Sequence, residues 1–264
     1  MTSIIREHKV YFAAVGLLAL WVGVWGYFIP THVDEAIPWL VPPLHARFLG
    51  AMYFSGTTFM VGCIFARRWA EVRVVLPMIA IWTGMLFVIS LFYLNEFDFT
   101  RPQSWIWFGA YFLYPIIALR LAWLQRATDL APAATARPAW VGAYLLAQGS
   151  LTTVLALALL FLPGFMVTVW PWQITPLLAQ LYSAPFLSYG VGSLMLARRQ
   201  TWLEIRIAVT ATLVFALGVL IASIIHRRLF SAAEVADWLW FGSFTIAVLM
   251  LGLLTIRAYS YTRL

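Results

Sequence analysis

Residues 205–226 read IRIAVTATLVFALGVLIASIIH, and Arg206 is the only charged side chain among them. A helix of about 20 apolar residues crosses the ~30 Å hydrocarbon core of a bilayer with all its backbone hydrogen bonds made internally. This stretch therefore predicts a membrane-spanning helix. Outward from it, in both directions, seven more stretches have a similar length and apolar character.

The complete set predicts an all-α polytopic membrane protein with eight transmembrane helices. Hydrophobic residues make up 63% of the 264-residue chain and charged residues 10%, which leaves too little polar surface to cover a soluble fold. The single cysteine, Cys63, excludes a disulfide framework. The predicted spans are about Val10–Pro30, Leu44–Ala66, Val74–Leu94, Ser104–Leu124, Ala139–Leu162, Ile174–Ala197, Ile205–His226 and Ala236–Arg257.

Positive charges predict the orientation of the helices, because Arg and Lys are retained on the cytoplasmic side during insertion. Of the 17 Arg and Lys residues, 13 fall in the N-terminal tail, in the loops after the second, fourth and sixth spans, or at the C-terminal end. Both termini are therefore expected in the cytoplasm, where these cations meet anionic lipid headgroups and not nucleic acid. Arg outnumbers Lys by 16 to 1, which is associated with GC-rich genes and favours a bacterial cytoplasmic membrane.

The chain repeats itself at a fixed offset of 133 residues. Trp69–Arg73 (WAEVR) aligns with Trp202–Arg206 (WLEIR), and Trp105–Gly109 (WIWFG) aligns with Trp238–Gly242 (WLWFG). Shared apolar character explains matches among Leu, Val and Ala, but not this common register of Trp, Glu, Arg and Gly. We therefore predict two four-helix membrane repeats, residues 1–128 and 139–264, joined by a cytoplasmic linker at residues 129–138.

The direction of the second repeat follows from the number of spans in the first. Because four is even, both repeats enter the membrane in the same direction, and their symmetry axis must lie along the membrane normal. The sequence thus predicts parallel repeats, seen as two four-helix bundles side by side.

Charged residues at the cytoplasmic start of the third and seventh spans form the first candidate site. One interpretation is a gate of ion pairs between the repeats. The other is helix capping by glutamate, at a helix end where negative charge is favoured, combined with lipid anchoring by arginine. The residues are Arg67, Arg68, Glu71 and Arg73 in one repeat and Arg198, Arg199, Glu204 and Arg206 in the other.

The second candidate site lies on the opposite, outer side, where the two halves differ. Arg47 aligns with Gln180 and His45 with Leu178, about a turn inside the second span of each half. A charged side chain at that depth is costly and usually faces protein or water, so Arg47 is the leading candidate for binding an anionic ligand. It could instead form a structural ion pair with one of four acids on the same side, Asp34, Glu35, Glu96 and Asp98.

Aromatic residues open the fourth and eighth spans on this outer side. They could line the apolar part of a ligand cleft, or they could belong to the aromatic belt that membrane proteins place at the lipid interface. These residues are Trp105, Trp107, Trp238 and Trp240.

No cofactor, metal or catalytic residue is expected. The only lysine, Lys9, lies at the end of a span, which excludes retinal, and the spans lack the mid-membrane histidine that haem would need. The His and acidic residues near the first outer loop lack the spacing of a zinc site on one helix. The chain also lacks Gly-x-Ser-x-Gly, His-Glu-x-x-His and a phosphate-binding loop, so we do not expect an enzyme.

These observations together predict a transporter or lipid-binding carrier. Its amphiphilic or anionic ligand would enter from the outer face at the seam between the repeats, with Arg47 and His45 at the charged end and the four tryptophans at the apolar part. Two alternatives stay open. One is a non-catalytic accessory subunit of a larger membrane complex; the other is an unrecognised lipid-modifying enzyme, which would need a reactive acid or histidine beside Arg47. The assembly stays open between a homodimer and a larger membrane complex.

Overall fold

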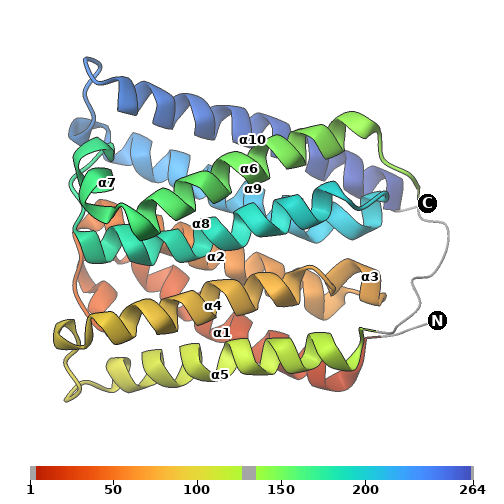
Figure 1. Ribbon diagram of the computed structural model, residues 1–264, viewed down its shortest axis with the longest axis horizontal. Helices are drawn as coiled ribbons and strands as arrows, with labels where there is room; N and C mark the ends of the chain where they lie inside the picture. Colours follow the sequence, from red (N-terminus) through yellow and green to blue (C-terminus); the bar gives the residue numbers. More distant parts are fainter. Residues whose placement is uncertain (1–3, 127–134, 263–264) are drawn as a thin grey trace.

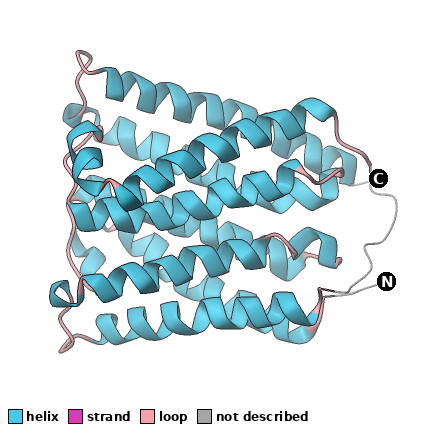
Figure 2. Ribbon diagram, viewed as in Figure 1, coloured by secondary structure: helices cyan, strands magenta, loops and turns pink. Residues whose placement is uncertain are grey.

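The computed structural model describes residues 4–126 and 135–262 of the chain. It is 82% helix, and the described residues contain no β-strand, which confirms the predicted all-α class (Figure 1 and Figure 2). The long helices are α1 (Arg6–Phe28), α2 (Pro43–Phe65), α4 (Val75–Phe92), α5 (Pro102–Leu124), α6 (Ala139–Phe161), α8 (Pro176–Ala197), α9 (Trp202–Ile225) and α10 (Val235–Thr262). Short helical segments connect them: η1 (Pro30–Glu35), α3 (Trp69–Val72), η2 (Leu94–Glu96), α7 (Pro163–Val169) and η3 (Arg227–Leu229).

Seven helical segments in the described part of the chain are long and apolar enough to cross a membrane. They correspond to seven of the eight predicted spans, and the exception is the sixth, α8. This helix has sufficient length, but Gln180 and several Ser and Gly residues lower its hydropathy. Its surroundings account for this composition, because α8 packs against α4, α6 and α9 and most of its residues are buried. A helix enclosed by other helices does not need a surface compatible with lipid.

Prolines mark the beginning of several long helices. Pro43, Pro102 and Pro176 are the first residues of α2, α5 and α8. The fixed φ of proline suits the first helical turn, where its missing N–H would have had no helical partner. The proline-rich segments before α2 and α8 therefore end where the sequence indicates.

The most extensive helix contacts join consecutive long helices, such as α1 with α2 and α6 with α8, but two further contacts, α2 with α9 and α4 with α8, join the two halves. α2 packs along α1 and α9, whereas α8 packs along α6 and α4. The α2–α9 and α8–α4 contacts correspond to each other, because α8 and α9 lie 133 residues after α2 and α4. We expected each half to form its own bundle, but in the described ranges the helices of the two halves pack between one another. Hydropathy indicates which segments span, but not which faces pair.

The bundle has two different ends (Figure 1). The η end carries η1, η2, η3 and α7, and the terminal end carries α3, the first residues of α1 and the last residues of α10. At the terminal end, the backbone N–H of Arg137 donates to the carbonyl of Gln200 (2.9 Å), so the end of the predicted linker lies against the α8–α9 loop. The remainder of that linker prediction, residues 129–134, lies outside the described residues.

Candidate functional site

Two ion pairs connect the halves of the chain at the terminal end. The guanidinium of Arg206 in α9 donates to the carboxylate of Glu71 in α3, and Arg73, which follows α3, donates to Glu204 in α9. The pairs are counterparts, because residues 71 and 204, and residues 73 and 206, are 133 positions apart. Each glutamate thus takes its arginine from the other half, which is the arrangement that an ion-pair gate requires.

Glu71 is the more enclosed of the two glutamates, with 2% of its side chain exposed against 11% for Glu204. Its Oε1 also accepts the backbone N–H groups of Arg67 (3.2 Å) and Arg68 (3.0 Å), so it satisfies donors at the start of α3. In the other half, the Thr201 hydroxyl donates to Oε2 of Glu204 at 3.0 Å. The same carboxylates therefore take part in both local helix-start hydrogen bonds and ion pairs.

Arg198 and Arg199, also at this end, have different surroundings. Burial lowers the pKa of Arg199, the Arg73 cation lowers it further, and Glu204 opposes both effects. Arg199 thus belongs to the surroundings of the Arg73–Glu204 pair. Arg198 is exposed and ends α8.

At the η end, Arg47 in α2 contacts His226, which follows α9. Nη1 of Arg47 donates to Nε2 of His226 at 2.6 Å, so the neutral ring carries its hydrogen on Nδ1. Burial lowers the pKa of His226, and the adjacent Arg47 cation lowers it further, which favours this neutral form. The counterpart contact, 133 residues away on each side, is uncharged: the Tyr93 hydroxyl donates to Oε1 of Gln180 at 2.6 Å.

In the described part of the chain, Arg47 forms no ion pair with any of the four acids proposed as its partners, Asp34, Glu35, Glu96 and Asp98. That expectation is not met, because η1 places Asp34 beside Arg101, at the start of α5. Nη2 of Arg101 donates to Oδ2 of Asp34 at 3.2 Å and to its backbone carbonyl at 2.6 Å. Asp98 accepts the hydroxyl and the backbone N–H of Thr100, and these hydrogen bonds lower its pKa.

His45 is buried within the bundle and does not reach the outer surface. Its Nδ1 lies 2.9 Å from the hydroxyl of Tyr182 in α8, and its ring packs against Trp172. Trp172 in turn packs against Trp240 of α10. The structure therefore places His45 in an aromatic cluster between α2 and α8, and not at a binding surface.

The four tryptophans proposed to line a ligand cleft lie in two kinds of environment. Trp107 and Trp240 are buried, and Trp105 and Trp238 are exposed. The indole N–H of Trp107 donates to the Ser90 hydroxyl and that of Trp240 to the Ser223 hydroxyl, each at 2.9 Å inside the bundle. Trp105 and Trp238 are 64% and 66% exposed and donate to backbone carbonyls of the preceding loops. The six residues proposed for ligand binding therefore do not line one common cavity.

An open hollow of about 690 Å³ lies at the η end, between the start of α2 and η3. Its walls are Pro42–Leu44 from the first half and Ile225–Leu229 from the second. Within the second segment, Arg227 and Arg228 are exposed, and His226 links the wall to Arg47. The hollow therefore combines apolar surface with positive charge.

Sequence reasoning assigned Arg47 to a site at this end, but not His226, Arg227 or Arg228. The signal for His226 was its alignment with Tyr93, together with the alignment of Arg47 and Gln180. If one of these pairs is in contact, the repeat predicts contact in the other. Neither pair was recognised as a contact, because its members lie on different halves of the chain.

Comparisons with known proteins do not assign this chain to a family. No protein-family model, curated protein or solved structure matches the chain. Within residues 4–126 and 135–262, no three His, Cys, Asp or Glu side chains gather where they could hold a metal ion. The fold defines the class only as an all-helical protein with seven helices suited to crossing a membrane.

Proposed function

We propose that this chain is an integral membrane transporter or carrier for an anionic amphiphile, whose charged end occupies the hollow between α2 and η3. The observation that carries the proposal is the exposed Arg227 and Arg228 beside apolar walls at one open site. Guanidinium groups bind carboxylate and phosphate oxygens through paired hydrogen bonds. Pro43 and Leu229 would contact the first carbons of the hydrophobic tail.

We also propose that the chain consists of two parallel four-helix repeats and that α8 is the eighth span. Corresponding contacts at the 133-residue offset support this, among them the two Trp–Ser hydrogen bonds and the two Glu–Arg pairs. With eight crossings both termini lie on the arginine-rich side, which is the cytoplasmic side of a bacterial membrane. The hollow then opens outward, with one wall from each repeat.

The ion pairs at the terminal end would close the same seam on the cytoplasmic side. Alternating access requires that one end of a pathway be shut while the other is open. The Glu71–Arg206 and Arg73–Glu204 pairs hold the halves together opposite the open hollow. In this scheme, the ligand would be released to the inner side only after these pairs separate.

The test measures binding of a fluorescent long-chain fatty acid to the purified chain in phosphatidylcholine vesicles. Replacing both Arg227 and Arg228 by Gln should weaken binding roughly 30-fold, since each arginine near an anionic group contributes about 1 kcal/mol. Arg47→Gln, which copies Gln180, should weaken binding as well. Arg101→Gln removes a positive charge at the same end, outside the hollow, and is the matched control.

Two results would overturn the proposal. One is unchanged affinity in the double variant and in Arg47→Gln. The other is an equal loss in Arg101→Gln, which would show that only the overall charge of the η end matters. A zwitterionic phosphocholine analogue of the probe should bind more weakly than the fatty acid to the unaltered chain.

A non-catalytic accessory subunit is the second candidate, and two glycines favour it. Gly109 in α5 and Gly242 in α10 have open space where a side chain would lie, so another helix could approach closely at each. Co-purifying subunits at native abundance would support this function. A lipid-modifying enzyme has less support, because the Nε2 of His226, the candidate base beside Arg47, already accepts the Arg47 hydrogen bond.

A further inference from the structure

A half-open cavity lies in the middle of the bundle, enclosed by α1, α2, α4, α5 and α8, and has a volume of about 70 Å³. Its lining residues include Val15 of α1 and Gly56 of α2, which lie near the midpoints of their helices. The cavity is therefore at mid-membrane depth, away from the hollow at the η end. No charged residue lines it.

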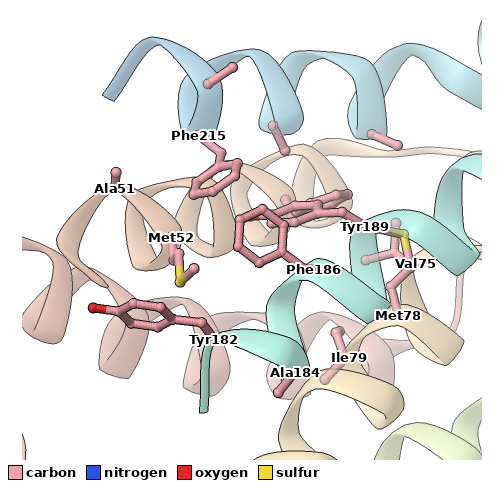
Figure 3. Close-up of a cluster of buried hydrophobic side chains, with 14 of the residues drawn as sticks. Ala51, Met52, Val75, Met78, Ile79, Tyr182, Ala184, Phe186, Tyr189 and Phe215 are labelled. Carbon is pink, nitrogen blue, oxygen red and sulfur yellow. The ribbon is translucent and has the colours of Figure 1, made fainter. Parts of the chain in front are cut away.

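The sequence explains why there is space on this side of the molecule. Gly56 and Trp82 both line the cavity, and the residues 133 positions later are Tyr189 and Phe215. The rings of Tyr189 and Phe215 stack with their centroids 5.0 Å apart and an angle of 17° between their planes (Figure 3). In the second half two aromatic rings thus pack together, whereas in the first half a glycine leaves room beside the Trp82 indole.

The same comparison shows that a pair of tyrosine hydroxyls is present in the first half only. Tyr53 and Tyr111 line it, and their hydroxyls are hydrogen-bonded to each other. The residues 133 positions later are Phe186 and Phe244, which have no hydroxyl. The first half has therefore both the space and the hydroxyl pair, and the second half has neither.

The hydroxyl pair can bind one more oxygen atom. Two phenol hydroxyls carry two hydrogens, and the bond between them uses one. In the described part of the chain, neither hydroxyl forms any other hydrogen bond, so the second hydrogen is available to a ligand. Two other hydroxyls of the wall, those of Thr83 and Ser188, already donate to backbone carbonyls, and Tyr114 also lines the wall.

The charge of the ligand follows from the wall. A charged group at the centre of a membrane is costly unless an opposite charge or water compensates it, and this wall has no charged side chain. A neighbouring cavity of about 20 Å³ shares Tyr53 and Trp82 and extends to Ile37 and Trp39, beneath the η end. The two cavities are separate but share Tyr53 and Trp82 as lining residues.

We propose that this cavity binds a neutral, lipid-soluble molecule with a single hydroxyl or carbonyl oxygen. The Tyr53–Tyr111 pair holds the oxygen, and Trp82, Met60 and their apolar neighbours contact the rest of the molecule. This site is distinct from the hollow lined by Arg227 and Arg228, and it does not depend on the function proposed for that hollow.

The test uses a long-chain alcohol with a photoreactive diazirine near its hydroxyl, added to the full chain in phosphatidylcholine vesicles. After illumination, mass spectrometry identifies the labelled peptides. Labelling should concentrate on the α2 and α4 peptides that contain Gly56 and Trp82. Gly56→Leu fills the cavity and should reduce this labelling about tenfold. The matched control is Gly109→Leu, which places the same side chain where there is open space outside the cavity.

The hydroxyl pair is tested with the Tyr53→Phe/Tyr111→Phe double variant, which copies Phe186 and Phe244 and changes little in volume. It should reduce labelling by the alcohol about fivefold, the effect of one hydrogen bond, and leave labelling by the corresponding alkane unchanged. Equal labelling of Gly56→Leu and the unaltered chain would overturn the proposal, as would labelling spread over all lipid-facing helices. Replacing Arg227 and Arg228 by Gln should have no effect here, so a failure of this site is distinguishable from a failure of the anionic site.

Discussion

The carboxylate of Glu71 accepts a hydrogen bond from Arg206, a residue 135 positions further along the chain. The carboxylate is almost fully buried and is also bonded to the backbone at the start of α3. A single side chain thus joins a helix start in the first half to α9 in the second. Its removal leaves several polar groups without their partner at once.

Glu71→Ala should lower the free energy of unfolding by about 3–5 kcal/mol, which is the cost of leaving one member of a buried ion pair without its partner. Glu204→Ala should cost less, because Glu204 is more exposed. Thermal unfolding in detergent compares the two. In a double-mutant cycle, Glu71→Arg with Arg206→Glu should recover part of the stability that either change loses alone. If both alanine variants unfolded at the same temperature as the unaltered chain, the ion pairs would not contribute to stability.

The buried Trp–Ser hydrogen bonds should contribute equally in the two halves. Trp107→Phe and Trp240→Phe each remove an indole donor, and each should cost about 1 kcal/mol of stability or somewhat more. The exposed Trp105 and Trp238 should tolerate the same change with a cost below about 0.5 kcal/mol. Melting temperatures of the four variants decide between this view and a shared role of all four tryptophans in ligand binding.

The pKa of His226 predicts a loss of stability in acid. Its pKa in the folded chain lies below the ordinary value of 6.5, so the unfolded chain binds more protons near and below that pH. The contribution of His226 is complete above pH 6.5 and is lost as the pH falls through the lowered folded value. His226→Gln keeps an acceptor for Arg47 but does not titrate, so it should lose less stability between about pH 7.5 and about pH 5.

Cysteine labelling tests the number of crossings. Cys63 is buried, so a membrane-impermeant maleimide should give little background in intact cells. Cysteines placed at the exposed Thr100 and Ala233 should react from outside, whereas those at Arg126 and Tyr261 should react only after the membrane is opened. Reaction at Tyr261 in intact cells would mean that α8 does not cross and that the chain has seven spans.

Much of the fold could be predicted from local sequence features. Hydropathy and length place the long helices, and prolines mark where α2, α5 and α8 begin, because these properties act within one segment. The 133-residue register predicts that contacts come in corresponding pairs, as those of Glu71 and Glu204 do. The polarity of α8 is the exception, since it depends on the helices that surround it.

The candidate sites were predicted less well, and the reason is physical. The spanning helices are apolar on nearly all sides, so their periodicity does not show which face meets lipid and which meets another helix. The sequence marked Arg47 as unusual, but its partner His226 lies 179 positions away. Only the tertiary structure brings those two together, turns Asp34 toward Arg101, and leaves a cavity beside Gly56.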